Sequence, residues 1–136
     1  MEDHRVALTR RAFQLYVGGD VEGMLELYSP EVEVTAPDFM NAGPFRGHEG
    51  YMEWLRRWNE AWDSFDFDIH AIEPVGEHHV VASVLVSGRG RGSGVEVRQM
   101  SYWVAEVREG QGTYVEVMTD EERAFDLARR REGIEN

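Results

Sequence analysis

Residues 17–34, VGGDVEGMLELYSPEVEV, decide the fold because they fix where two helices end and where the first strand begins. Upstream of them, apolar residues recur every three or four positions, which predicts a first helix that the Gly18-Gly19 pair ends. Asp20 is a suitable N-cap for a second, short helix, and Ser29-Pro30 closes that helix. Apolar and polar residues then alternate from 31 to 36, so this segment is predicted to be a strand with one buried face.

The rest of the chain continues with a helix, four strands and a final helix. After Gly47, large apolar side chains share one helical stripe, namely Tyr51, Trp54, Leu55, Trp58 and Trp62. Alternation predicts strands at residues 65–72, 80–86, 95–104 and 113–118. The glycine-rich residues 87–94 lie between two of these strands and precede no helix, so we interpret them as a hairpin connection and not as a phosphate-binding loop. The final helix is predicted to begin at the capping sequence 119–122 and to end at three arginines.

Length and composition limit the class of protein. The 136 residues suffice for one hydrophobic core and show no internal boundary, so residues 1–136 are expected to form a single domain. The absence of cysteine excludes thiolate nucleophiles and thiolate metal sites. No apolar run approaches the ~20 residues that span a bilayer, and the first residues lack a signal-peptide profile. We therefore expect a cytoplasmic protein without a membrane partner.

The charged residues exclude several kinds of chemistry. The net charge is −12, and all 14 basic residues are arginine. Without lysine, the side chains can form neither a Schiff base nor the phosphate clamp of a P-loop. An acidic surface repels the phosphate backbone, so no nucleic-acid partner is expected. The five histidines lack metal-ligand spacing, and we expect neither a metal nor a cofactor.

The helix–helix–strand order, followed by Pro44-Phe45-Arg46-Gly47 and the tryptophan-rich helix, resembles the SnoaL-like family of the nuclear transport factor 2-like (ketosteroid isomerase-like) superfamily. The resemblance implies an α+β fold, the cone-shaped, cystatin-like α+β barrel. In this fold three N-terminal helices pack on a strongly curved mixed or antiparallel sheet, and a short C-terminal helix follows. Isomerases, cyclases, epoxide hydrolases and binding proteins share this cone, so the resemblance predicts the architecture and leaves the reaction open.

The resemblance also indicates where the catalytic residues of related enzymes would lie. Ketosteroid isomerases use a helix tyrosine, an aspartate base and a strand aspartic acid. In this chain these positions fall on Ala12, on Ala36 and near Trp103. The last-strand aspartate of limonene-type epoxide hydrolases falls on Val117, so both sets of residues are missing. SnoaL-type polyketide cyclases depend on one carboxylate in a shaped apolar pocket, and their motif is too loose to assign that carboxylate here.

The family geometry defines a predicted pocket on the inner face of the sheet. If Val115 and Val117 face the cavity, then Gln99, Ser101 and Trp103 face it too, because side chains alternate along a strand. The complete predicted lining is Tyr16, Ala36, Phe39, Trp54, Leu55, Trp58, Gln99, Ser101, Trp103, Val115 and Val117.

Two residues are candidates for catalysis. Asp38 lies beside Phe39 and Met40 in a loop, where burial would raise the pKa of its carboxyl group and make it a general base. The alternative for Asp38 is a solvated turn residue. Tyr16 would donate a hydrogen bond to a ligand oxygen, and its alternative is a tyrosine that only packs in the core.

Three functions follow from this pocket. The first is a pocket protein that binds a small apolar or aromatic metabolite. The second is a polyketide-cyclase-, isomerase- or epoxide-hydrolase-like enzyme that uses Asp38 with Tyr16 or Gln99. The third is a structural dimerisation module in which tryptophan side chains fill the cavity.

Apolar residues with outward strand parity indicate a further contact surface. These residues are Tyr102, Val104, Tyr114 and Met118. A homodimer formed through the outer sheet face would bury them, and this is the arrangement we expect. The alternative is that the last helix or the N-terminal arm covers the same patch.

Overall fold

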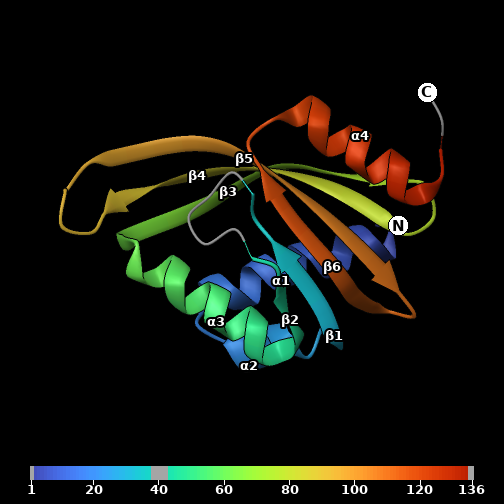
Figure 1. Ribbon diagram of the computed structural model, residues 1–136, viewed down its shortest axis with the longest axis horizontal. Helices are drawn as coiled ribbons and strands as arrows, with labels where there is room; N and C mark the ends of the chain where they lie inside the picture. Colours follow the sequence, from blue (N-terminus) through green and yellow to red (C-terminus); the bar gives the residue numbers. More distant parts are fainter. Residues whose placement is uncertain (1, 38–42, 135–136) are drawn as a thin grey trace.

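The computed structural model describes residues 2–37 and 43–134, which form four helices and one six-stranded sheet (Figure 1). In chain order the elements are α1 (His4–Val17), α2 (Val21–Leu25), β1 (Tyr28–Thr35), β2 (Phe45–Arg46), α3 (Gly47–Glu60), β3 (Trp62–Val75), β4 (His79–Gly90), β5 (Glu96–Arg108), β6 (Gln111–Met118) and α4 (Glu121–Glu132). This confirms the predicted α+β fold, including the hairpin between β4 and β5.

The sheet is mixed and strongly curled. Its strand order is β2-β1-β6-β5-β4-β3. The β1–β6 pair is parallel, and every other neighbouring pair is antiparallel. Strands β2 and β3 lie at opposite edges of this order, so the sheet is curled but not closed into the barrel that the resemblance implied.

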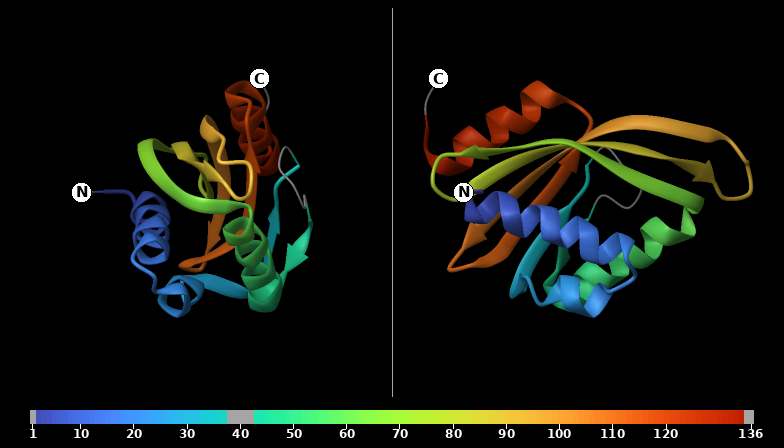
Figure 2. Two further views of the ribbon diagram at one scale, coloured as in Figure 1. Left: turned by 90° about the vertical axis from the view of Figure 1, so that its left-hand side faces the viewer. Right: turned by 180° about the vertical axis from the view of Figure 1, so that it is seen from behind.

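Helices cover both faces of the sheet. Helices α1 and α3 pack on the concave face, whereas α4 lies on the opposite face (Figures 1 and 2). The larger buried cluster joins side chains of α1, α2 and α3 to the inner face, and a smaller one lies between α4 and the outer face. No helix in the described ranges is long and apolar enough to cross a membrane.

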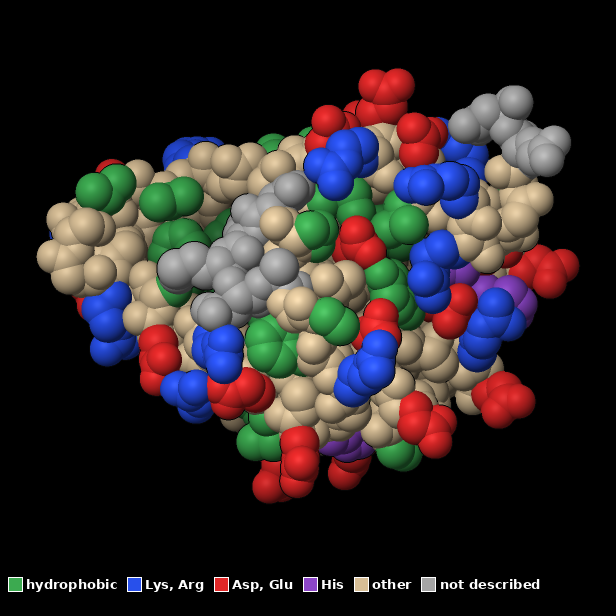
Figure 3. Space-filling view, in the orientation of Figure 1, with side chains coloured by type: hydrophobic (Ala, Val, Ile, Leu, Met, Phe, Trp, Pro, Cys, Tyr) green, Lys and Arg blue, Asp and Glu red, His purple; other side chains and the backbone are tan. Residues whose placement is uncertain are grey.

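Charged side chains form exposed pairs between neighbouring elements. On the face shown in Figure 3, acidic and basic side chains are intermingled. One such pair joins Arg46 of β2 to Glu33 of β1, with 3.2 Å between nitrogen and oxygen. Exposed pairs of this kind contribute little to stability, so the buried apolar clusters hold the fold together.

Two predicted helix boundaries are wrong because strand pairing outweighs local periodicity. Helix α2 ends at Leu25, and Tyr28 already belongs to β1, where it pairs with Gly112 of β6. A methyl group built on Gly112 would overlap the Tyr28 ring, so glycine is required for this close approach. Trp62, predicted on the stripe of α3, instead opens β3 and pairs with Gly90.

The apolar patch on the outer face is covered by α4. Val104 and Met118 are 0% and 1% exposed and pack with Ala124 and Ala128 of α4. The expectation that a second copy of the chain buries these two residues is therefore wrong. The alternative, coverage by the last helix, is what the structure shows.

A buried histidine anchors the C-terminal end of α4. The His79 ring is hydrogen-bonded through Nδ1 to Glu132, whose carboxylate also accepts the backbone N–H groups of Glu77 and His78 at 3.0 and 2.8 Å. Burial raises the pKa of Glu132, but these hydrogen bonds outweigh burial and lower it to about 2. Glu132 thus stays ionised and ties α4 to the turn before β4.

We expect Glu132→Gln to destabilise the protein by about 2 kcal/mol at neutral pH, because it replaces a charged hydrogen-bond acceptor. The pKa of Glu132 is lowered on folding, so the wild-type advantage is complete above the ordinary value of 4.5 and is lost as the pH falls toward 2. Urea unfolding across this range, with the exposed Glu73→Gln as control, measures the effect. A difference that stays constant with pH would contradict this account.

Substituting Gly112 by alanine should cost about 1–3 kcal/mol, because the added methyl group displaces the Tyr28 ring. Gly90→Ala, at the end of β4, is the control, since a methyl group there meets the flexible Ser93 hydroxyl at 3.0 Å and the Val95 carbonyl oxygen at an ordinary contact distance of 3.7 Å. Thermal unfolding of the two variants gives the comparison, and equal stabilities would show that Gly112 does not fix Tyr28.

Candidate functional site

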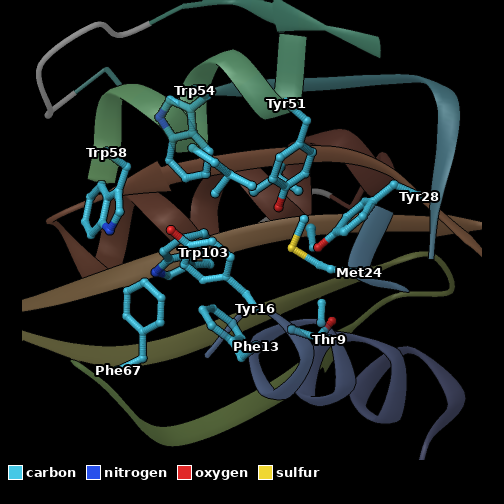
Figure 4. Close-up of a pocket in the computed structure, with 14 residues that line it drawn as sticks. Thr9, Phe13, Tyr16, Met24, Tyr28, Tyr51, Trp54, Trp58, Phe67 and Trp103 are labelled. Carbon is cyan, nitrogen blue, oxygen red and sulfur yellow. The ribbon is translucent and has the colours of Figure 1, made fainter. Parts of the chain in front are cut away.

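A cavity lies between α1, α3 and the concave face of the sheet (Figure 4). Its walls are almost entirely apolar, with aromatic rings on several sides. They comprise Thr9, Ala12, Phe13, Tyr16, Met24, Tyr28, Tyr51, Trp54, Leu55, Trp58, Phe67, Trp103, Ala105 and Val115. The free cavity volume is only about 30 Å³, enough for about two water molecules.

Helical spacing places the aromatic side chains of α3 and of α1 on the faces that line the cavity. On α3, Tyr51, Trp54 and Trp58 recur at intervals of three and four and point at the sheet. On α1, Phe13 and Tyr16 are three residues apart, and their rings enter the cavity from the side opposite α3. The period of 3.6 residues thus places both sets of rings over the concave face.

Trp103 of β5 lies at the centre of the aromatic walls. Its ring centroid lies 4.9 Å from that of Phe13, 5.8 Å from that of Trp54 and 5.9 Å from that of Phe67, all in edge-to-face geometry. Such pairs add stability beyond their buried area. The cluster joins α1, α3, β3 and β5 through one side chain.

The polar atoms near Trp103 and on α1 have hydrogen-bond partners within the protein. The Trp103 indole N–H donates to the Ser101 hydroxyl at 2.8 Å, and Ser101 donates to the Val84 carbonyl at 2.8 Å. The Thr9 hydroxyl donates to the Arg5 carbonyl at 2.9 Å. These walls therefore present apolar surface to a ligand.

Tyr16 lies at the solvent-exposed end of the cavity. Its hydroxyl donates to Asn59 Oδ1 at 2.6 Å, which joins α1 to α3. Burial raises the pKa of Tyr16 to about 12, against the smaller opposing effect of the Asn59 hydrogen bond. Tyr16 is therefore a neutral hydrogen-bond donor at physiological pH.

The structure brings together about half of the predicted pocket residues. Tyr16, Trp54, Leu55, Trp58, Trp103 and Val115 line the cavity. Ala36, Ser101 and Val117 are fully buried beside it but do not line it. Asp38 and Phe39 lie outside the described residues.

Gln99 does not face the cavity, contrary to prediction. It is exposed, and its side-chain amide donates to the Met100 carbonyl at 2.9 Å. Strand parity gives the face of a side chain but not whether a helix covers that part of the strand. Gln99 lies where β5 extends beyond the covering helices.

Several wall residues were not predicted, although some carried a signal. Tyr51 and Phe13 share the helical faces of Trp54 and Tyr16, so periodicity alone could have added them. Ala12 does line the cavity, at the position where the family comparison placed the isomerase tyrosine. Met24 and Tyr28 lie on the apolar face of the predicted second helix, but that pattern marks them only as buried, and Tyr28 belongs to β1 in the structure.

The described wall residues offer few groups that could take part in acid–base or metal chemistry. None of the described residues that line the cavity carries a carboxylate or an imidazole. No three His, Asp or Glu side chains within the described ranges are placed to hold a metal ion. The arrangement is suited to enclosing an apolar molecule.

Solved structures show the same fold at low sequence identity. An NTF2-like protein of unknown function from Burkholderia pseudomallei has a TM-score of 0.79, 17% identity and coverage of 93% of this chain and 98% of its own. A Mycobacterium tuberculosis protein in complex with estradiol-17β-hemisuccinate has a TM-score of 0.73, 12% identity and coverage of 89% and 97%. A protein from Jannaschia sp., described as a putative SnoaL-like polyketide cyclase, has a TM-score of 0.74, 18% identity and 88% coverage of both chains.

These likenesses show the fold alone, and no curated protein sequence matches the chain. The family assignment comes from a sequence model. The model of the SnoaL-like domain matches residues 9–121, which include most of α1, the whole of α3 and all six strands. The chain therefore belongs to the SnoaL-like domain family.

Proposed function

We propose that the protein binds a small apolar or aromatic molecule in the cavity between α1, α3 and the sheet. The observation that supports this most is the aromatic cavity wall, whose polar atoms near Trp103 are already bonded within the protein. An apolar ligand would leave no buried polar atom there without its partner. The M. tuberculosis structure with estradiol-17β-hemisuccinate supports the proposal as an instance of ligand binding on this fold.

Binding requires the walls to move. The present cavity of about 30 Å³ is far smaller than the ~300 Å³ or more typical of ligand pockets. The Tyr16–Asn59 hydrogen bond lies at the exposed end and joins α1 to α3 there. Breaking one exposed hydrogen bond costs about 1 kcal/mol, which burial of an aromatic ring can offset.

The small volume also favours a second candidate function, a structural module. In that case the tryptophan and phenylalanine rings are a permanent core, and no ligand enters. The two functions make opposite predictions for the uptake of a planar aromatic probe such as 2-naphthol.

The enzymatic alternative depends on Asp38. Because the described wall residues carry no carboxylate or imidazole, an acid–base reaction in this cavity would need Asp38 or another residue outside the described ranges. A homodimer and a cytoplasmic location also stay predictions. Since α4 buries Val104 and Met118, a dimer would have to use another surface.

Ala12→Leu should reduce the affinity for 2-naphthol at least about tenfold, because the larger side chain occupies the cavity next to Phe13. Isothermal titration calorimetry measures the affinity, and circular dichroism checks that the variant is folded. Ala71→Leu, on a partly exposed position of β3, is the control. Unchanged binding by Ala12→Leu, or no binding by the wild type, would exclude this cavity as the ligand site.

Asp38→Asn separates binding from catalysis. As a binding protein, the variant should keep the wild-type affinity for 2-naphthol within about twofold. If a reaction is found for the wild type, an unchanged rate in Asp38→Asn removes the enzymatic alternative that uses this carboxylate. A rate loss with intact binding would establish it.

A further inference from the structure

Two tyrosines meet deep in the cavity, away from the exposed end. Tyr28 comes from the first position of β1 and Tyr51 from α3, and their ring centroids lie 4.9 Å apart. Both are buried cavity-wall residues. Figure 4 shows their hydroxyl groups converging beside Met24.

The two rings are held in place independently of any ligand. Gly112 leaves room for the Tyr28 ring, and His48 Nε2 is hydrogen-bonded to the Tyr28 carbonyl at 2.9 Å. Tyr51 packs edge-to-face on Trp54, with 5.9 Å between centroids. These two side chains are therefore already in place, and the wall movement that binding requires falls on other residues of the cavity.

The number of available hydrogen-bond donors distinguishes this pair from the Thr9 and Tyr16 hydroxyls of the wall. The hydroxyls of Thr9 and Tyr16 donate to Arg5 and Asn59. In the part of the chain that the structure describes, the hydroxyls of Tyr28 and Tyr51 are each other's hydrogen-bond partners, and Tyr16 adds only an electrostatic effect on Tyr51. Two phenols have two O–H donors, and one mutual hydrogen bond uses one of them. The second donor is available to an oxygen atom in the cavity.

We propose that the Tyr28–Tyr51 pair is the polar anchor of the pocket, and that the ligand is a neutral, planar apolar molecule with a hydroxyl or carbonyl oxygen at one end. This inference rests on the proposed binding function and adds the ligand class. The aromatic walls hold the apolar body, and the phenol pair holds the oxygen.

The electrostatics of the cavity agree with a neutral ligand. Burial raises the pKa of Tyr28 and of Tyr51, so both phenols stay protonated and act as donors. No arginine or histidine lies among the described wall residues. A carboxylate ligand would therefore lose its hydration without gaining a cationic partner.

The test compares two probes that differ by one hydroxyl group, naphthalene and 2-naphthol, by isothermal titration calorimetry. The wild type should bind 2-naphthol about three- to tenfold more tightly than naphthalene, the range that one neutral hydrogen bond provides. The double variant Tyr28→Phe/Tyr51→Phe, which removes both O–H donors, should lose this preference, whereas each single variant keeps one donor. Tyr102→Phe, a tyrosine on the other side of the sheet beneath α4, should keep the preference.

The outcomes separate this inference from the proposed function. If both probes bind but the wild type shows no preference, or the folded double variant keeps it, the anchor is disproved and the binding function stands. If neither probe binds to the wild type, the binding function fails and the anchor fails with it. If the double variant does not fold, the comparison of the two probes on the wild type still decides, because the anchor requires a preference for 2-naphthol there.

Discussion

The packing of Trp103 against Phe13, Trp54 and Phe67 is the interaction on which the rest of the structure depends. A curled sheet has a concave face that two helices cannot fill with small side chains. Large rings span this gap, and their edge-to-face contacts set the spacing between α1, α3 and the sheet. The cavity is the space that these rings leave, so fold stability and ligand selection depend on the same residues.

The outer face of the sheet is stabilised by different contacts, which involve α4. There α4 covers a small apolar cluster, and the buried His79–Glu132 contact holds the end of the helix. A buried ionised group is tolerated because its hydrogen bonds are satisfied by backbone N–H groups and an imidazole. Because α4 packs on the outer face, only α1, α2 and α3 among the described helices contribute side chains to the cavity on the concave face.

Periodicity predicted the elements that depend on local sequence. It assigned the faces of α1 and α3, and therefore Tyr16, Trp54 and Trp58, because helical spacing is visible in a short window. It missed Tyr28, whose place depends on Gly112 far along the chain. Gln99 was misplaced for a similar reason, since strand parity does not report where the covering helices stop. The position of α4 over the outer face likewise depends on tertiary packing.

Methionine methyl NMR tests the central claim most directly, because three methionines report on three environments. Met24 lines the cavity, Met118 is buried beneath α4, and Met52 is exposed. In protein with labelled methionine methyl groups, assigned with Met24→Leu, saturating 2-naphthol should shift the Met24 signal most through its ring current. An unchanged Met24 signal, or a larger shift at Met118 or Met52, would show that the cavity between α1, α3 and the sheet is not the binding site.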